Sequence, residues 1–145
     1  MPEAMLIGRI SSDHLLVRPI ERENASSADF LDGNWVKCRV EVRSGGFSGA
    51  VDASLRAEAF ASFRDQLREL SRTLKGNASF VPMEPWVTIN LKGDCRHELE
   101  ALCLVRDQLG GGNVLHATIK LEVSFLPEIL AGLDRICEAF PVVGR

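Results

Sequence analysis

The sequence predicts an α+β fold in which an antiparallel sheet built from consecutive hairpins packs against two amphipathic helices. Three observations support this prediction. Apolar and polar residues alternate in several short segments, as they do in strands with one buried face. Short turn-forming segments join these strands, which favours antiparallel pairing over parallel crossovers. Two longer segments instead repeat apolar residues at every third or fourth position, which is typical of amphipathic helices.

Composition and length are those of an ordinary globular protein. The chain has 145 residues, 46% of them hydrophobic, so we treat residues 1–145 as a single α+β domain with its own core. The net charge of -3 gives no overall attraction for nucleic acid. No apolar run approaches the roughly 18 residues that cross a bilayer, so we expect no membrane partner. The start of the chain, "MPEAMLIGRI", does not resemble a signal peptide, and we expect a cytoplasmic protein with reduced cysteines.

The first half of the chain predicts two hairpins separated by a surface loop. The runs "AMLIGRI" and "HLLVRPI" flank the turn formers at 11–13 and form the first hairpin, and the polar segment 21–34 follows as a loop. The second hairpin lies within "WVKCRVEVRSGGFSGAVDASL", where a turn at Ser44–Gly45 would pair Arg43 with Gly46. In this register the core-facing residues include Cys38, Val40 and Phe47. The solvent-facing residues include Lys37, Arg39 and Asp52.

A change of period predicts the first helix, and strands return after it. The apolar stripe of this helix consists of Phe60, Phe63, Leu67, Leu70 and Leu74. Gly76 is expected to end the helix in the left-handed conformation. The next strands are expected at "ASFV", at 87–91, and on both sides of the glycine-rich loop 109–113. The second helix begins near Pro127 and ends before Pro141.

The segment 95–125 contains two cysteines and two histidines, but their positions argue against a metal site. In a strand, alternate residues point to opposite faces, and Cys95, His97 and Cys103 share one parity. His116, on the next strand, points away from that strand's long apolar set. If the apolar faces of the two strands match, His116 lies across the sheet from the other three. Cys95 and Cys103 are also about 26 Å apart along an extended chain. Ligands of one zinc ion must instead converge on a single point. We therefore expect no metal and no cofactor.

The same positions argue against catalysis. Three cysteines lie on predicted core faces, namely Cys38, Cys103 and Cys137. In a core, cysteine acts as a small hydrophobic residue. Cys95 lies in a turn and is the one candidate thiol. The loop "LGGGN" joins two strands and does not lead into a helix, so it is not a phosphate-binding loop. We expect no catalytic residue, and the protein is not predicted to be an enzyme.

The polar face of the second-half sheet gives a candidate partner-binding surface. If Lys92 pairs with Arg96, then Glu98 and Glu100 share one face with Glu122 on the next strand. Three carboxylates on one face would suit a basic protein partner. The alternative interpretation is an ordinary solvated face.

Apolar residues interrupt this polar face. In the same register Trp86 lies opposite Leu102, and Leu104 follows on the same side. A solvated face does not ordinarily carry such residues uncovered. One alternative is that the loop 21–34 or the N-terminal hairpin covers them. The other is that they contact a partner or a second copy, with Trp86 as the anchor. The candidate partner-binding residues are therefore Trp86, Leu102, Leu104, Glu98, Glu100 and Glu122.

Four segments, in this order and spacing, resemble a bacterial family described as WapI-like immunity proteins. They are "WVKCRVEVRSGGFSGAVDASL", "FRDQLRELSRTLKGNASF", "VTINLKGDCRHELEAL" and "LEVSFLPEILAGLDRICEAFPVVG". The most specific parts are "GGFSG" after a strand, "LKG" after the first helix and "FPVVG" after the last. The resemblance implies an antiparallel sheet packed against helices, and it implies that the protein binds and neutralises a secreted polymorphic toxin.

The leading functional hypothesis is a cytoplasmic protein-binding module that acts as an immunity protein. The alternative is a structural or regulatory homo-oligomer with no toxin partner. An enzyme forms a third class, which would require an apolar pocket with convergent polar groups of perturbed pKa.

Overall fold

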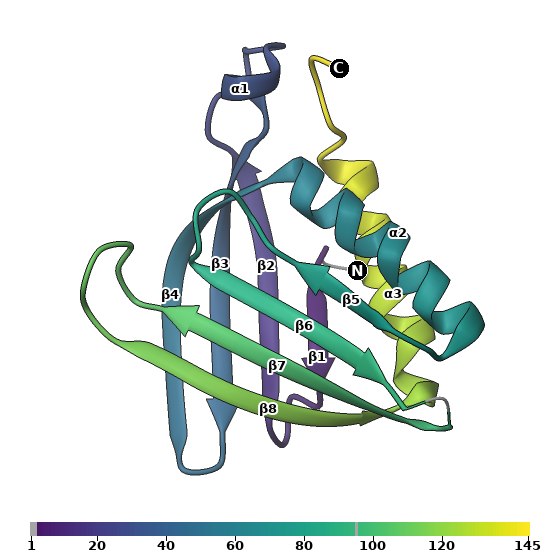
Figure 1. The fold of residues 1–145 in the computed structure, drawn as a ribbon. Coiled ribbons are helices and arrows are strands. Elements are labelled where there is room, and N and C mark those ends of the chain that lie inside the picture. The colour runs from purple at the N-terminus through teal and green to yellow at the C-terminus, as the bar shows by residue number, and fades with distance from the viewer. Residues whose placement is uncertain (1–2, 95) are drawn as a thin grey trace.

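The computed structural model describes residues 3–94 and 96–145, and its strands form two antiparallel sheets of four strands each (Figure 1). The first sheet contains β1 (Met5–Gly8), β2 (His14–Arg22), β3 (Trp35–Ser44) and β4 (Phe47–Arg56). The second contains β5 (Asn77–Phe80), β6 (Val87–Gly93), β7 (Glu98–Arg106) and β8 (Val114–Glu122). Within each sheet every strand pairs with the next in the sequence, so the predicted α+β class is confirmed, with the hairpins divided between two sheets.

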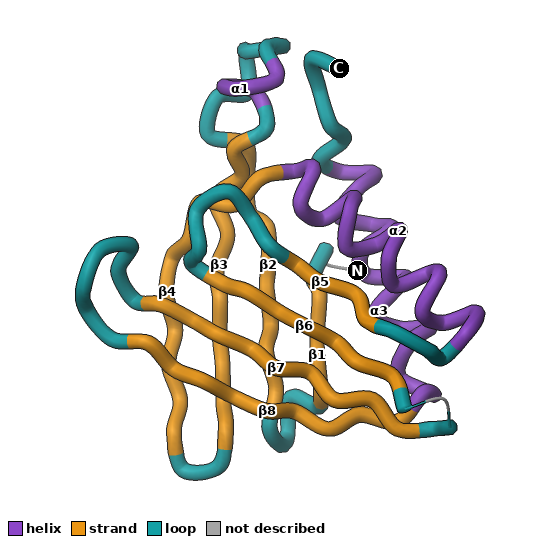
Figure 2. Tube along the Cα trace, viewed as in Figure 1, coloured by secondary structure: helices purple, strands orange, loops and turns teal. Residues whose placement is uncertain are grey.

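A long helix follows each sheet. The helices are α1 (Phe30–Gly33), α2 (Ala57–Thr73) and α3 (Leu126–Ala139), and the 3-10 turn η1 (Val123–Phe125) leads into α3. α2 and α3 contact each other and lie along one side of the sheets, against β5 and β1 respectively (Figure 2). The short α1 lies in the segment predicted as a loop, and the Asp29 carboxylate caps it by accepting from the N–H groups of Leu31 and Asp32. No helix in the described part of the chain is long and apolar enough to cross a membrane.

The core lies between the inner faces of the sheets and the two long helices. Alternate residues of the strands are buried, among them Val36, Cys38, Val40, Ile89, Leu91 and Ile119. The predicted stripe of α2 packs on the second sheet, since the rings of Phe60 and Phe63 lie 5.1 and 5.9 Å from the ring of Phe80 in β5. α3 adds Ile129, Leu133 and Ile136.

α2 ends two residues before the predicted position. Leu74 caps the helix in the left-handed conformation (φ 58°), and its N–H donates to the carbonyl of Leu70. Gly76, which was expected in this role, also has a positive φ (87°) but lies beyond the end of the helix. The Leu74 side chain packs against the core, so the helix ends where its apolar stripe ends. A Cβ atom on Gly93 of β6 would lie 2.7 Å from the Leu74 carbonyl oxygen, so the close approach of helix and strand requires glycine there.

The β3–β4 hairpin has a register two residues away from the predicted one. The turn is Gly45–Gly46 and Ser44 pairs with Phe47, because Gly45 can adopt the positive φ (59°) that a two-residue turn requires. An even shift leaves every side chain on its predicted face, so Cys38 is buried and Lys37 is exposed.

The prediction that Phe47 belongs to the core is wrong. Its side chain is 72% exposed, because the tip of the β3–β4 hairpin extends beyond the second sheet, which covers the rest of the inner face (Figure 1). Asp52 faces Arg39 rather than Lys37, and the two form an ion pair at 2.9 Å.

The β6–β7 register differs from the predicted one by four residues. Lys92 faces Glu100 rather than Arg96, because the connection between the strands is not a tight turn. The Asp94 carboxylate organises this longer connection by accepting from the N–H groups of Arg96 (2.8 Å) and Glu98 (3.3 Å). Cys95, the candidate thiol, lies outside the described residues.

Candidate functional site

Five of the six candidate partner-binding residues lie on the outer face of the second sheet. They are Glu98, Glu100, Leu102 and Leu104 of β7 and Glu122 of β8. Alternate residues of a strand share one face, and the four-residue shift of register is even, so this grouping matches the sequence prediction. The five residues form a strip that follows β7 from its acidic start to its apolar end.

The carboxylates of this strip are not equivalent. Glu98 lies directly opposite Glu122, which places like charges side by side. Glu100 instead lies between Lys92 of β6 and Lys120 of β8, so its cross-strand neighbours carry the opposite charge. The expected surface of three free carboxylates is therefore reduced to the pair Glu98–Glu122.

The apolar part of the strip is open to solvent. Leu102 is 39% exposed and Leu104 is half-buried, and Val81 and Val114 are exposed on the same side of the molecule. This face turns toward the viewer in Figure 1, and neither the segment 21–34 nor the N-terminal hairpin lies over it. A shallow cavity of about 240 Å³ lies here, lined by Val81, Leu102, Leu104 and His116 among others.

Trp86 does not join this strip. Val87 faces Val105, so Trp86 precedes the ladder, and its carbonyl accepts from the N–H of Arg106 at 2.9 Å. The expected pairing of Trp86 with Leu102 is wrong, because it depended on the shorter turn. The half-buried Trp86 instead lines a cavity of about 500 Å³ together with Cys38 and Ala53 of the first sheet.

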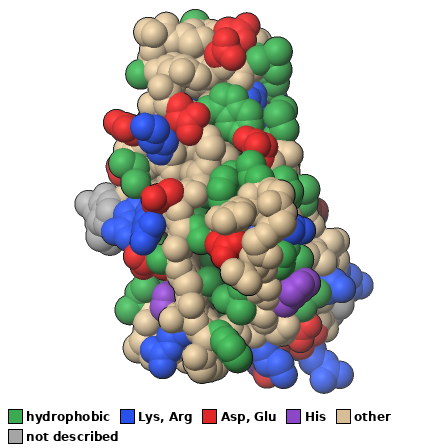
Figure 3. Space-filling model, turned by 90° about the vertical axis from the view of Figure 1, so that its left-hand side faces the viewer, with side chains coloured by type: hydrophobic (Ala, Val, Ile, Leu, Met, Phe, Trp, Pro, Cys, Tyr) green, Lys and Arg blue, Asp and Glu red, His purple; other side chains and the backbone are tan. Residues whose placement is uncertain are grey.

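Figure 3 shows the side of the molecule on which β4 lies, where hydrophobic side chains gather near the middle between charged groups. The cavity that contains Trp86 has on its rim Glu21, Glu23, Lys37 and Asp52. Lys37 pairs with Glu21 at 3.5 Å, and the Ser54 hydroxyl donates to Glu23. Asp52 pairs with Arg39, so each of these four charged groups already has a partner.

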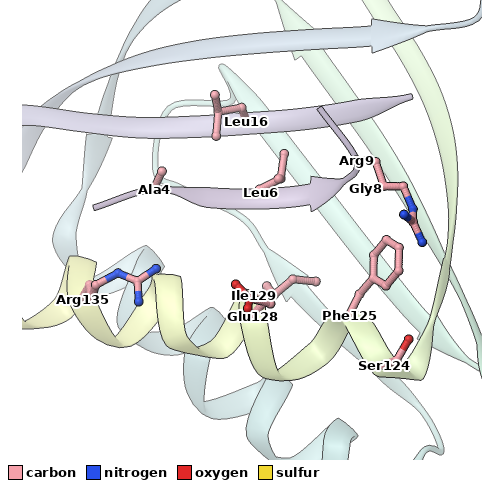
Figure 4. Close-up of a pocket in the computed structure, with 10 residues that line it drawn as sticks. All are labelled: Ala4, Leu6, Gly8, Arg9, Leu16, Ser124, Phe125, Glu128, Ile129 and Arg135. Atoms are coloured by element: carbon pink, nitrogen blue, oxygen red, sulfur yellow. The ribbon is translucent and has the colours of Figure 1, made fainter. Parts of the chain in front are cut away.

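A further cavity, of about 430 Å³, lies between the first hairpin and the start of α3 (Figure 4). Its apolar walls are formed by Ala4, Leu6, Leu16, Phe125 and Ile129. The Arg9 guanidinium lies 4.9 Å from the centre of the Phe125 ring, whereas Arg135 lies at the other end of the cavity. Sequence reasoning missed this cavity because its walls come from opposite ends of the chain.

Burial makes three of the thiols poor nucleophiles. Burial, with a smaller contribution from the Glu23 carboxylate, raises the pKa of the Cys38 thiol. Burial also raises the pKa of Cys103 to about 12 and raises the pKa of the half-buried Cys137. The thiolate is the reactive form, so these thiols stay protonated near neutral pH. In residues 3–94 and 96–145, no three His, Cys, Asp or Glu side chains are grouped as metal ligands.

Three arginines, Arg64, Arg68 and Arg72, form a basic stripe on α2, and each is in an ion pair. Arg64 pairs with Asp65 at 3.1 Å, and Arg68 pairs with Asp134 of α3 at 2.7 Å. Arg72 pairs with Glu69, which lowers the pKa of that carboxyl through a hydrogen bond and through its charge. The stripe is therefore a solvated, charge-balanced helix face.

Comparison with known proteins gives a family match along almost the whole chain. A family model described as "Immunity protein WapI-like family" matches residues 5–141. No curated protein matches the chain. Among solved structures, a chain described as "Crystal structures of trypanosoma bruciei MRP1/MRP2" is 13% identical, with a TM-score of 0.48. That similarity covers 96% of this chain and 86% of the other.

Proposed function

The chain belongs to the immunity protein WapI-like family, and from this membership we propose that it binds and neutralises a bacterial polymorphic toxin. The family match carries the proposal, since it spans both sheets, α2 and α3 and supports an immunity-type protein-binding role. An immunity protein acts by binding, so the proposal assigns the chain no catalytic step. It also assigns the chain to the cytoplasm, with a protein rather than a nucleic acid or a membrane as its partner.

The proposed contact surface is the outer face of the second sheet. The exposed Leu102 and the half-buried Leu104 form its apolar part, and the pair Glu98–Glu122 lies at the other end. An apolar centre with charged groups around it is typical of protein interfaces. Two adjacent carboxylates repel each other, so a cationic side chain from a partner would relieve an unfavourable contact. A basic partner, such as a toxin that acts on nucleic acid, fits this surface. Trp86 lines a different cavity and is not part of it.

Co-expression tests the proposed function. Cells that produce a toxin-like protein encoded next to the gene for this chain should survive when the chain is co-expressed and die with an empty vector. If no neighbouring gene product is neutralised, the proposal is wrong.

Charge reversal then tests the surface. Glu98→Lys combined with Glu122→Lys should weaken binding of the neutralised toxin and reduce its dependence on salt, because the carboxylates that attract it are lost. The matched control is Asp65→Lys combined with Glu69→Lys on α2, which makes the same charge change on exposed residues elsewhere. Equal effects of the two pairs would show that only net charge matters, and the proposed surface would be wrong.

A further inference from the structure

Among the strands of the described residues, β4 has the least protected outer edge. The edge strands of the two sheets are β1, β4, β5 and β8. β1 contacts α3, and β5 contacts α2. The edge strand β8 carries Lys120 and Glu122, charges that discourage pairing with another strand. β4 has ten residues, and from 47 to 55 its one charged side chain is Asp52. Long edge strands without lysine, proline or bulges are templates for pairing with another chain.

The turn determines which backbone groups of β4 face outward. Ser44 and Phe47 flank a two-residue turn, so Phe47 exchanges its backbone hydrogen bonds with β3. Hydrogen-bonded and non-bonded pairs alternate along an antiparallel ladder. The N–H and carbonyl groups of Ser48, Ala50 and Asp52 therefore point away from β3. These side chains are small, so a second backbone can approach them closely.

We propose that two copies of the chain pair their β4 edges antiparallel, about a twofold axis that passes beside Ala50. In this register Ala50 faces Ala50 of the second copy, Ser48 faces Asp52 and Phe47 faces Ala53. The two first sheets become one continuous eight-stranded sheet. The interface is isologous, since both copies contribute the same surface.

The exposed Phe47 supports a second copy as the occupant of this edge. Its ring is 72% exposed at the tip of the hairpin and lies on the core-facing side of β4 by parity. Pairing would place the ring beside Ala53 of the second copy, which lines the cavity of about 500 Å³ together with Cys38 and Trp86. Each copy thus has both an exposed ring and a cavity that can receive the ring of the other copy. The twofold axis therefore creates two identical contacts of this kind.

Charge complementarity selects the register. Arg43 faces Ser48 across β3 and β4 and has no carboxylate within ion-pair distance among the described residues. The pairing brings Asp52 of the second copy to the other side of Ser48, about 9.6 Å from β3, within reach of the long Arg43 side chain. A slip of four residues would instead set the two Asp52 carboxylates directly opposite each other, which is unfavourable.

A cysteine at the axis tests the register. The variant Ala50→Cys should form a disulfide-linked dimer under mild oxidation, because the two Cα atoms would be about 5.5 Å apart, within the range that a disulfide spans. Ser48→Cys and Ser54→Cys should not cross-link faster than the wild-type chain, since neither faces itself in this register. Cross-linking of either of these, or none at Ala50→Cys, would overturn the proposal.

Sedimentation of the complete chain tests the edge itself. Wild-type protein should sediment as a dimer of the 15.9 kDa chain at high concentration. Ala50→Pro should raise the dimer dissociation constant at least about tenfold, because two central hydrogen bonds are lost. Proline is tolerated where the N–H faces solvent at an edge. Ala50→Ser, which retains the N–H, is the matched control, and near-wild-type melting of both variants shows that the fold is intact.

Phe47→Ser should also weaken the dimer, whereas Val81→Ser, which removes a similarly exposed apolar side chain just after β5, should not. A wild-type chain that stays monomeric, or a dimer that Ala50→Pro leaves unchanged, would overturn the proposal. Neither result would bear on toxin neutralisation.

Discussion

Arg56 is a buried charged side chain with several polar contacts. It is 1% exposed, and its guanidinium donates to the carbonyls of Phe30 (2.7 Å) and Leu31 (2.8 Å) and pairs with Glu58. The guanidinium also lies over the Trp35 ring, 4.9 Å from its centre. One residue therefore joins α1, the start of β3 and the first turn of α2. Such a charge is stabilising only while all its partners remain.

Arg56→Met should lower the free energy of unfolding by about 3–5 kcal/mol, because it leaves the Glu58 carboxylate and two carbonyls without their donor. Urea unfolding followed by circular dichroism measures this loss. The control is Arg72→Met, which removes an exposed arginine from an ion pair on the same helix and should leave the unfolding midpoint unchanged. Equal midpoints for the two variants would show that the buried contacts of Arg56 do not stabilise the fold.

Thiol labelling gives a second test at this scale. Cys38 and Cys103 are buried, and their pKa values are raised, so an alkylating reagent near pH 8 should modify them only after unfolding. Peptide mass spectrometry resolves each site, and Cys137, which is half-buried, should react before either of them. Rapid labelling of Cys103 in the folded protein would contradict its position on the inner face of β7.

At the scale of the elements, the period of the apolar residues predicted well which face of each strand is buried, but it predicted the pairing registers of the strands poorly. The faces of β3 and β7 are those predicted, although the registers differ by two and four residues, because an even shift does not change which side chains are buried. The choice between Ser44–Gly45 and Gly45–Gly46 depends on turn conformation, which composition does not determine. The pairing of Glu98 with Glu122 lies within the predicted strip, whereas Trp86 was misplaced because the prediction assumed a tight turn between Lys92 and Arg96. The cavity beside Phe125 depends on tertiary contacts and has no local sequence pattern.

The packing of α2 leads to a prediction for this scale. Leu67 is fully buried between the helix and the sheet, so Leu67→Ala should lower the free energy of unfolding by about 2–5 kcal/mol. The matched control is Leu31→Ala on α1, where the side chain is 63% exposed and the expected change is within about 0.5 kcal/mol. A loss at Leu67 no larger than at Leu31 would mean that α2 is peripheral to the stability of the fold.

At the scale of the whole molecule, the segment after α3 returns to the loop that contains α1. Asn34 is fully buried, and its amide donates to the carbonyl of Val143 (3.0 Å) while its carbonyl oxygen accepts from the Val143 N–H (3.0 Å). Gly144 has a φ of 77°, and a Cβ there would lie 2.3 Å from the Phe30 nitrogen. The "FPVVG" segment, which the sequence marks as specific, therefore contacts residues more than 100 positions earlier.

These contacts form one unit, and a double-mutant cycle measures their coupling. Asn34→Ala leaves buried backbone groups of Val143 unpaired, so it should lower the free energy of unfolding by about 1–3 kcal/mol. Gly144→Ala should release the same segment, because its Cβ would overlap α1 and its φ is left-handed. Once one substitution has detached the segment, the second has little left to disrupt, so the double variant should lose less than the sum. Combining Asn34→Ala with Asn113→Ala, in the exposed loop between β7 and β8, should instead be additive. Additive losses for Asn34 and Gly144 would show that the two positions act independently and that the terminal segment does not dock as a unit.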